Sequence, residues 1–134
     1  MKRDKKMKSD TIETRTSQFW LDEDGILWVK TLPQAYYTLA DAQRNVAIMY
    51  QLAGSKKRPV LVEMKQIKGM AGDARSYSAG DAVVSITSAL AMVIGSPLGK
   101  VLGNLWLGIN KPPFPTRMFN SETAAVGWLK GFLG

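Results

Sequence analysis

The chain has 134 residues, of which 46% are hydrophobic, and it contains neither cysteine nor histidine. The missing cysteines exclude disulfides, thiolate metal sites and cysteine nucleophiles, and are typical of the reducing cytoplasm. The missing histidines remove the commonest general base and zinc ligand, so metal binding would depend on 11 carboxylates. We expect one compact cytoplasmic domain without a metal or a cofactor.

The first ten residues, MKRDKKMKSD, hold five basic and two acidic residues, which is +3 of the net charge of +7. A charge block without apolar periodicity is typical of a solvated tail, and this one lacks the apolar segment of a signal peptide. We therefore expect residues 1–17 to form a flexible basic tail and residues 18–134 to form the folded domain. A salt-sensitive attraction of the tail to nucleic acid or anionic lipid stays open.

Two apolar runs flank Asp24-Gly25 in FWLDEDGILWVK, and this dipeptide favours a tight turn between two strands. The side chains of Asp22, Glu23 and Asp24 are interpreted as a turn tip, because no second cluster of cation ligands accompanies them.

A helix and a buried strand are predicted next. Thr38 and Asp41 have the spacing of a capping box, and Gly54 supplies a stop. The apolar face between them consists of Leu39, Ala42, Val46, Met49 and Ala53. After Pro59 the run VLVEM is typical of a buried strand. A second, short helix is expected to begin near Asp73.

Residues 82–99 are 18 residues without a charge, which is the lower limit for a membrane span. Their polar side chains and the break at Gly95-Ser96-Pro97 favour two elements of a soluble protein instead. The first is a strand over residues 86–94, and the second is a helix with Ser96 as N-cap and Pro97 as first residue. The helix face expected to meet the core consists of Leu98, Val101, Leu102, Leu105 and Ile109.

The C-terminal part predicts a stiff connection over residues 110–115, a strand over residues 116–119 and a final helix capped by Ser121. The whole order is β-β-α-β-α-β-α-β-α. Such alternation predicts a single α/β domain, with a mostly parallel sheet of about five strands and about four helices.

Four strings, PVLVEMKQI, ALAMVIGSPLGKVLGN, INKPPFPTRMF and AVGWLKGFL, resemble bacterial STAS-like proteins of the SpoIIAA-like fold, and more narrowly a small single-domain group of unknown function. The resemblance covers about residues 19–133. It implies the SpoIIAA-like fold and no established reaction. The wider fold family contains anti-sigma factor antagonists, transporter regulatory domains and lipid-carrying relatives.

STAS regulators place a phosphorylatable serine in the loop after the third strand. In this chain the resemblance puts Gly72 and Asp73 at that place, with Ser76 one turn later. This departure puts phosphorylation in doubt. Asp73 is interpreted as the N-cap of the helix that follows.

The sequence carries no recognisable catalytic motif. There is no G-x-S-x-G elbow, and in GSPLGKV only three residues separate Gly95 from Gly99, so the string is not a phosphate-binding P-loop. Glu63 and Asp73 are expected near the same sheet edge and leave a pair of catalytic carboxylates open. We expect no enzyme and no catalytic residue.

A ligand in a parallel sheet binds beyond the carboxyl ends of the strands. The residues expected there form a hypothetical anion site of Lys65, Arg75, Ser96, Gly99 and Lys100. In the alternative interpretation the lysines are solvated, Ser96 only caps its helix, and Arg75 pairs with Asp73 or Asp81.

Trp106 and Phe114 form a hypothetical partner surface, although burial in the core explains them equally well. We expect first a non-catalytic STAS-like regulatory or interaction module that binds a protein partner, or itself as a homodimer. The alternative is a carrier or sensor of a small anionic or lipid-like ligand, and an uncharacterised enzyme comes third. No specific nucleic-acid binding and no membrane span are expected.

Overall fold

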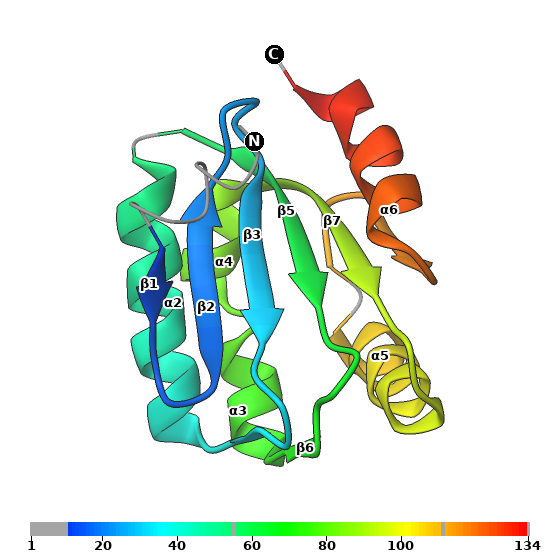
Figure 1. Cartoon of the computed structure of the whole chain (residues 1–134). Coiled ribbons are helices and arrows are strands. Elements are labelled where there is room, and N and C mark those ends of the chain that lie inside the picture. Colours follow the sequence, from blue (N-terminus) through cyan, green and yellow to red (C-terminus); the bar gives the residue numbers. More distant parts are fainter. Residues whose placement is uncertain (1–10, 55, 111, 134) are drawn as a thin grey trace.

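A computed structural model of the chain describes residues 11–54, 56–110 and 112–133, and for residues 105–110 it describes the backbone only. Within these ranges the main sheet has six strands in the order β1-β2-β3-β5-β7-β8 (Figure 1). They are β1 (Ile12–Glu13), β2 (Ser17–Leu21), β3 (Leu27–Thr31), β5 (Arg58–Glu63), β7 (Thr87–Val93) and β8 (Thr116–Phe119). The first three pair antiparallel, and β3, β5, β7 and β8 pair parallel. The predicted mostly parallel α/β sheet is confirmed.

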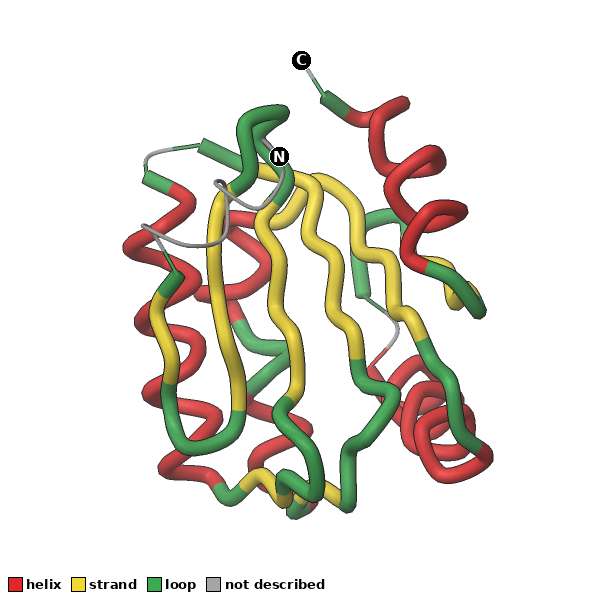
Figure 2. Tube along the Cα trace, viewed as in Figure 1, coloured by secondary structure: helices red, strands yellow, loops and turns green. Residues whose placement is uncertain are grey.

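Two short strands, β4 (Tyr36–Tyr37) and β6 (Gly69–Met70), pair parallel at one end of the main sheet (Figure 2). Each has two residues, which is too short to show a periodicity. The sequence therefore gave no signal for them.

The helices cover the two faces of the sheet unequally. On one face lie α2 (Leu39–Ala53), α3 (Gly72–Tyr77) and α4 (Asp81–Ile86), and on the other lies α6 (Glu122–Leu129), followed by the 3₁₀ turn η1 (Lys130–Phe132) (Figure 1). The remaining helix, α5 (Pro97–Asn110), lies beyond the carboxyl ends of β5 and β7. No helix in the described part of the chain is long and apolar enough to cross a membrane.

The folded domain begins earlier than predicted. Strand β1 pairs with β2, and Thr16 and Ser17 are fully buried. Residues 11–17 therefore belong to the sheet and not to a tail. The polar composition of this segment gives no strand signal, because the edge strand has only two residues. Residues 1–10 lie outside the described part of the chain.

The predicted cap of α2 is confirmed. The Thr38 N–H donates to Asp41 Oδ2 at 2.9 Å, and the Asp41 N–H donates to Thr38 Oγ1 at 3.3 Å. The guanidinium of Arg15 also donates to the Asp41 carboxylate and is the main cause that lowers the pKa of Asp41. One carboxylate thus connects the start of α2 to the segment between β1 and β2.

The structure corrects the role of Asp73. Helix α3 begins at Gly72 with Ala71 as N-cap and without a side-chain cap, so Asp73 lies exposed inside the first turn. The expected single helix is also divided, because the chain turns at residues 78–80 and starts again as α4. Both helices have six residues.

The start of α5 is as predicted, but its buried face is only partly so. Leu102 packs against the core as expected, and the side chains of Leu105 and Ile109 lie outside the described residues. Ser96 Oγ accepts from the Gly99 N–H at 3.0 Å, as an N-cap does. Leu98 and Val101, expected in the core, are 43% and 59% exposed, whereas Gly99 and Gly103 are buried. A Cβ on Gly99 would lie 3.2 Å from the Met64 carbonyl oxygen, and one on Gly103 would lie 3.0 Å from Met118 Sδ. The two glycines therefore let the helix backbone approach the sheet, and Leu98 and Val101 turn outward.

The acidic hairpin is a turn, as predicted. Asp22 Oδ1 accepts from the backbone N–H groups of Asp24 at 2.9 Å and Ile26 at 3.0 Å, and Asp22 Oδ2 accepts from Trp28 Nε1 at 2.8 Å. The residue is buried, and Gly25 supplies the positive φ of the turn.

Asp22→Ala should lower the free energy of unfolding by about 2–3 kcal/mol, because three donors lose a buried acceptor. Asp24→Ala is the matched control: its ion pair with Lys130 is exposed, so about 0.5 kcal/mol or less is expected. Urea unfolding followed by tryptophan fluorescence measures both. Equal losses for the two variants would contradict the role given to Asp22.

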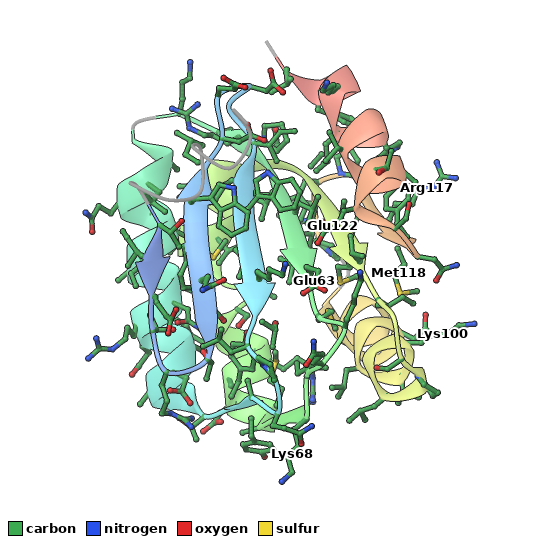
Figure 3. All side chains as sticks on the ribbon, in the orientation of Figure 1. Glu63, Lys68, Lys100, Arg117, Met118 and Glu122 are labelled. Atoms are coloured by element: carbon green, nitrogen blue, oxygen red, sulfur yellow. The ribbon has the colours of Figure 1, made fainter. Side chains whose placement is uncertain are left out.

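One carboxylate is buried on the α6 face of the sheet. Glu63 ends β5, is 4% exposed, and pairs in register with Lys30 on β3. Figure 3 shows it on the same side of the sheet as Glu122 at the start of α6. Burial is the main cause that raises the pKa of Glu63; the Glu122 charge adds to it, and the Lys30 and Lys65 charges oppose it.

A carboxyl group with a raised pKa binds its proton more tightly in the folded state, so it lowers stability as the pH rises from about 4 through the folded-state pKa. Glu63→Gln removes this titration. The free energy of unfolding of the variant, relative to the wild type, should therefore increase between pH 4 and pH 7. Denaturant titrations at several pH values test this, with Glu13→Gln at an exposed position as control. A relative loss of stability toward pH 7 would contradict the burial argument.

Candidate functional site

Helices α2, α3 and α4 leave a cavity between themselves and the main sheet. A cavity of about 130 Å³ lies between β3, β5 and β7 on one side and α2, α3 and α4 on the other. At one end α5 contributes Leu102 and Gly103 to the wall. Val62 lies on an interior strand but is only partly buried, and it lines this cavity.

The wall of the cavity is mainly apolar and adaptable. The branched side chains that line it come from strands and helices alike and include Val29, Val46, Val60, Val62, Val83 and Leu90. Four methionines, Met49, Met64, Met70 and Met92, complete the wall. Methionine is flexible and polarisable, so such a wall adjusts to occupants of different shape.

Six polar side chains also line the cavity, and two of them, Tyr37 and Thr31, bind each other. The Tyr37 hydroxyl lies 3.0 Å from Thr31 Oγ1 and 2.5 Å from Ser17 Oγ. Burial is the main cause that raises the pKa of Tyr37, so the phenol stays neutral at ordinary pH.

Three further polar side chains of the wall are also satisfied within the protein. Asn45 Nδ2 donates to Thr16 Oγ1, and Asn45 Oδ1 accepts from Thr14 Oγ1, both at 3.0 Å. The hydroxyls of Ser78 and Thr87 donate to carbonyl oxygens four residues before them, at 2.9 and 2.6 Å. These groups need no ligand.

Arg75 of α3 is the exception. Its Nε is buried and has no hydrogen-bond partner. Among the described residues it forms no ion pair, so the expected pairing with Asp73 or Asp81 is not seen. Among the described residues that line this cavity, Arg75 is the one with a cationic side chain.

Of the five residues predicted to bind an anion, only Arg75 lines the cavity. Lys65 is exposed and packs its Cγ across Gly95. Ser96 Oγ accepts from the Gly99 N–H, so this N–H at the start of α5 is already paired. Lys100 is exposed and points away from the sheet (Figure 3).

The predicted partner surface is partly wrong. Phe114 is buried in the core cluster on the α2 face. It is buried because the Leu90 N–H donates to the Pro115 carbonyl oxygen at 2.9 Å, which draws the segment before β8 along β7. The side chain of Trp106 lies outside the described residues.

The two carboxylates considered for catalysis do not meet. Successive side chains of β5 point to opposite faces of the sheet. Val60 and Val62 point to the α2 face, so Glu63 points to the α6 face, whereas Asp73 lies exposed on α3 at the α2 face. Among the residues that the structure describes, no three acidic side chains gather as a metal site would require.

The cavity itself was not predicted, although one of its residues had a signal in the sequence. Asn45 stands among the apolar residues Ala42, Val46 and Met49 on the buried face of α2. A polar side chain at such a position indicates a buried hydrogen bond. Tyr37 and the methionines had no comparable signal.

Known proteins support the fold and give no activity. Among curated proteins, none matches the chain. An uncharacterised protein of the DUF3478 family with a SpoIIAA-like fold, from Shewanella loihica PV-4, is 16% identical over 89% of this chain and 90% of that chain, with a TM-score of 0.61. A protein of unknown function from Arthrobacter sp. FB24 is 34% identical over 88% of this chain and 95% of that chain, with a TM-score of 0.34.

The similarity to the Shewanella protein confirms the SpoIIAA-like fold expected from the sequence. The family model for a domain of unknown function, DUF7793, matches residues 19–133, which is most of the chain and all strands from β3 onward. The chain therefore belongs to the DUF7793 family.

Proposed function

We propose that the chain is a non-catalytic module that binds a small, largely apolar ligand, as a carrier or a sensor. The observation that carries this proposal is the cavity between the sheet and helices α2, α3 and α4. Ligand sites are typically concave and mainly apolar, with a few polar groups that orient the ligand. The absence of cysteine supports a location in the cytoplasm.

The size of the cavity sets the size of the ligand. An engineered apolar cavity of about 150 Å³ accepts benzene, so about 130 Å³ suits a body of about six carbon atoms. An empty apolar cavity of this volume costs about 3 kcal/mol of stability, at about 24 cal/mol per Å³. A ligand that fills it recovers part of this free energy.

Toluene and 1-hexanol should bind the wild-type protein and raise its melting temperature, with amide shifts concentrated at the cavity wall. Val62→Phe should abolish this binding, because the phenylalanine ring would occupy the cavity from near the carboxyl end of β5. Heteronuclear NMR titration and thermal unfolding measure both effects. Val62→Ile, which adds one methyl group, is the matched control and should retain binding. Shifts spread over the surface, or unchanged binding by Val62→Phe, would contradict the proposal.

A second function is supported by the outer face of α5. Leu98 and Val101 are exposed, and they are neighbours because they lie three residues apart on one helix. Exposed apolar neighbours of this kind mark contacts with other proteins. We propose that this face binds a protein partner, with a second copy of the chain as the simplest candidate.

If α5 mediates a homodimer, the double variant Leu98→Lys/Val101→Lys should weaken self-association by about 10-fold or more, because two charges would be buried at the contact. Sedimentation velocity over a range of concentrations gives the dissociation constant. Tyr50→Lys, at an exposed tyrosine of α2, is the control and should not change it. A wild-type protein that stays monomeric at every concentration would rule out the homodimer.

A further inference from the structure

Arg75 indicates which class of ligand the cavity takes. Its guanidinium is folded against the start of its own helix: Nη2 lies 3.7 Å from the point where a Cβ on Gly72 would be. Nε is buried without a partner, while the residue as a whole is partly exposed. The cation therefore lies where the apolar cavity meets solvent.

An unpaired buried donor of a charged group is costly, and arginine cannot lose its charge in a protein. The other polar side chains of the wall already have partners within the chain. A ligand that pairs with the guanidinium therefore gains a charge-assisted hydrogen bond and breaks none of these bonds.

The charge of the ligand follows from the charge of the wall. Within the part of the chain that the structure describes, Arg75 is the single cation of the cavity wall, and the other wall residues there are apolar or already paired. A monoanion would be balanced by it, whereas a phosphate dianion would keep an unpaired charge near apolar atoms. A carboxylate fits best, since its two oxygens match the fork of donors on the guanidinium.

We propose that the cavity binds a monocarboxylate with an apolar body of about six carbon atoms, whose carboxylate accepts hydrogen bonds from Arg75 at the cavity mouth while its body lies among Val62, Met92 and Leu102. This inference rests on the proposed ligand-binding function. It adds the chemical class of the ligand and the residue that recognises it.

Hexanoate and 1-hexanol test the inference, because they share a six-carbon chain and differ in charge. In NMR or calorimetric titrations at pH 7, hexanoate should bind the wild type about 10-fold more tightly than 1-hexanol. Arg75→Met should weaken hexanoate binding by about 10–100-fold and change 1-hexanol binding by no more than about 3-fold. Arg75→Lys keeps the charge without the fork and should lie between the two.

Lys65→Met is the matched control, because it removes one positive charge from an exposed position outside the cavity wall. It should change hexanoate binding by no more than about 3-fold, since exposed charges are screened. Equal losses for Arg75→Met and Lys65→Met would mean general attraction to a basic protein and would overturn the inference. If Arg75→Met does not fold, Arg75→Gln replaces it.

The experiment distinguishes a failure of the carboxylate proposal from a failure of the proposed ligand-binding function. Equal or tighter binding of 1-hexanol to the wild type would overturn the choice of a carboxylate and leave the ligand-binding function standing. If neither compound binds while the wild type is folded, both the carboxylate and the proposed function are wrong.

Discussion

The parallel strands β3, β5 and β7 carry apolar side chains on both faces, and the rest of the structure depends on covering them. On one face Ala89 and Ala91 of β7 are small enough for α6 to lie close, and both are fully buried there. On the other face Val60, Val62 and Met92 need cover along the whole strand. A strand of six residues is about 20 Å long, whereas a helix of six residues is about 9 Å long. Helices α3 and α4 are therefore too short to cover the strands singly, and the turn between them leaves the cavity.

Hydrogen bonding explains why, among the described residues of the cavity wall, Arg75 alone has a buried polar group available for a ligand. The Tyr37 hydroxyl binds both Thr31 and Ser17, and Asn45 joins α2 to the segment between β1 and β2. Such a network is costly when incomplete, so its members are fixed in place. The Arg75 guanidinium is different, since its charge persists and its Nε has no partner among the residues that the structure describes. A wall with one unpaired cation and no other free polar group selects for charge as well as for size.

Local signals in the sequence predicted most of the fold. The hairpin at Asp22, the capping box of Thr38 and the cap at Ser96 depend on neighbours within a few residues, and all three are present. Tertiary contacts decided the rest. The stripe of Leu98 and Val101 has the stronger periodicity, but close approach to Met64 and Met118 selects the glycine face of α5 instead.

The candidate site was less predictable, for a related reason. A cavity is a space that no residue fills, and it arises from helix lengths and crossing positions that no local pattern encodes. The sequence indicates Arg75 as an anion-site residue only because it is basic and is expected near the end of a strand. The structure places it in the wall of a cavity on the α2 face and not at the start of α5, where Ser96 and Gly99 satisfy each other.

The two proposed functions share one helix. Leu102 and Gly103 of α5 line the cavity, and Leu98 and Val101 of the same helix are exposed on its outer side. A ligand and a partner would thus contact neighbouring sides of one helix, whose glycines let it approach the sheet. If α5 has two positions with different affinity for the ligand, thermodynamic linkage requires the ligand to change partner affinity, and the partner to change ligand affinity, by the same factor. If α5 is rigid, the ligand does not change the affinity for the partner. The module is then a carrier, and a partner cannot distinguish the loaded from the empty protein. Measuring the dissociation constant of hexanoate with and without the α5 contact therefore separates a sensor from a carrier, because only a sensor gives two values.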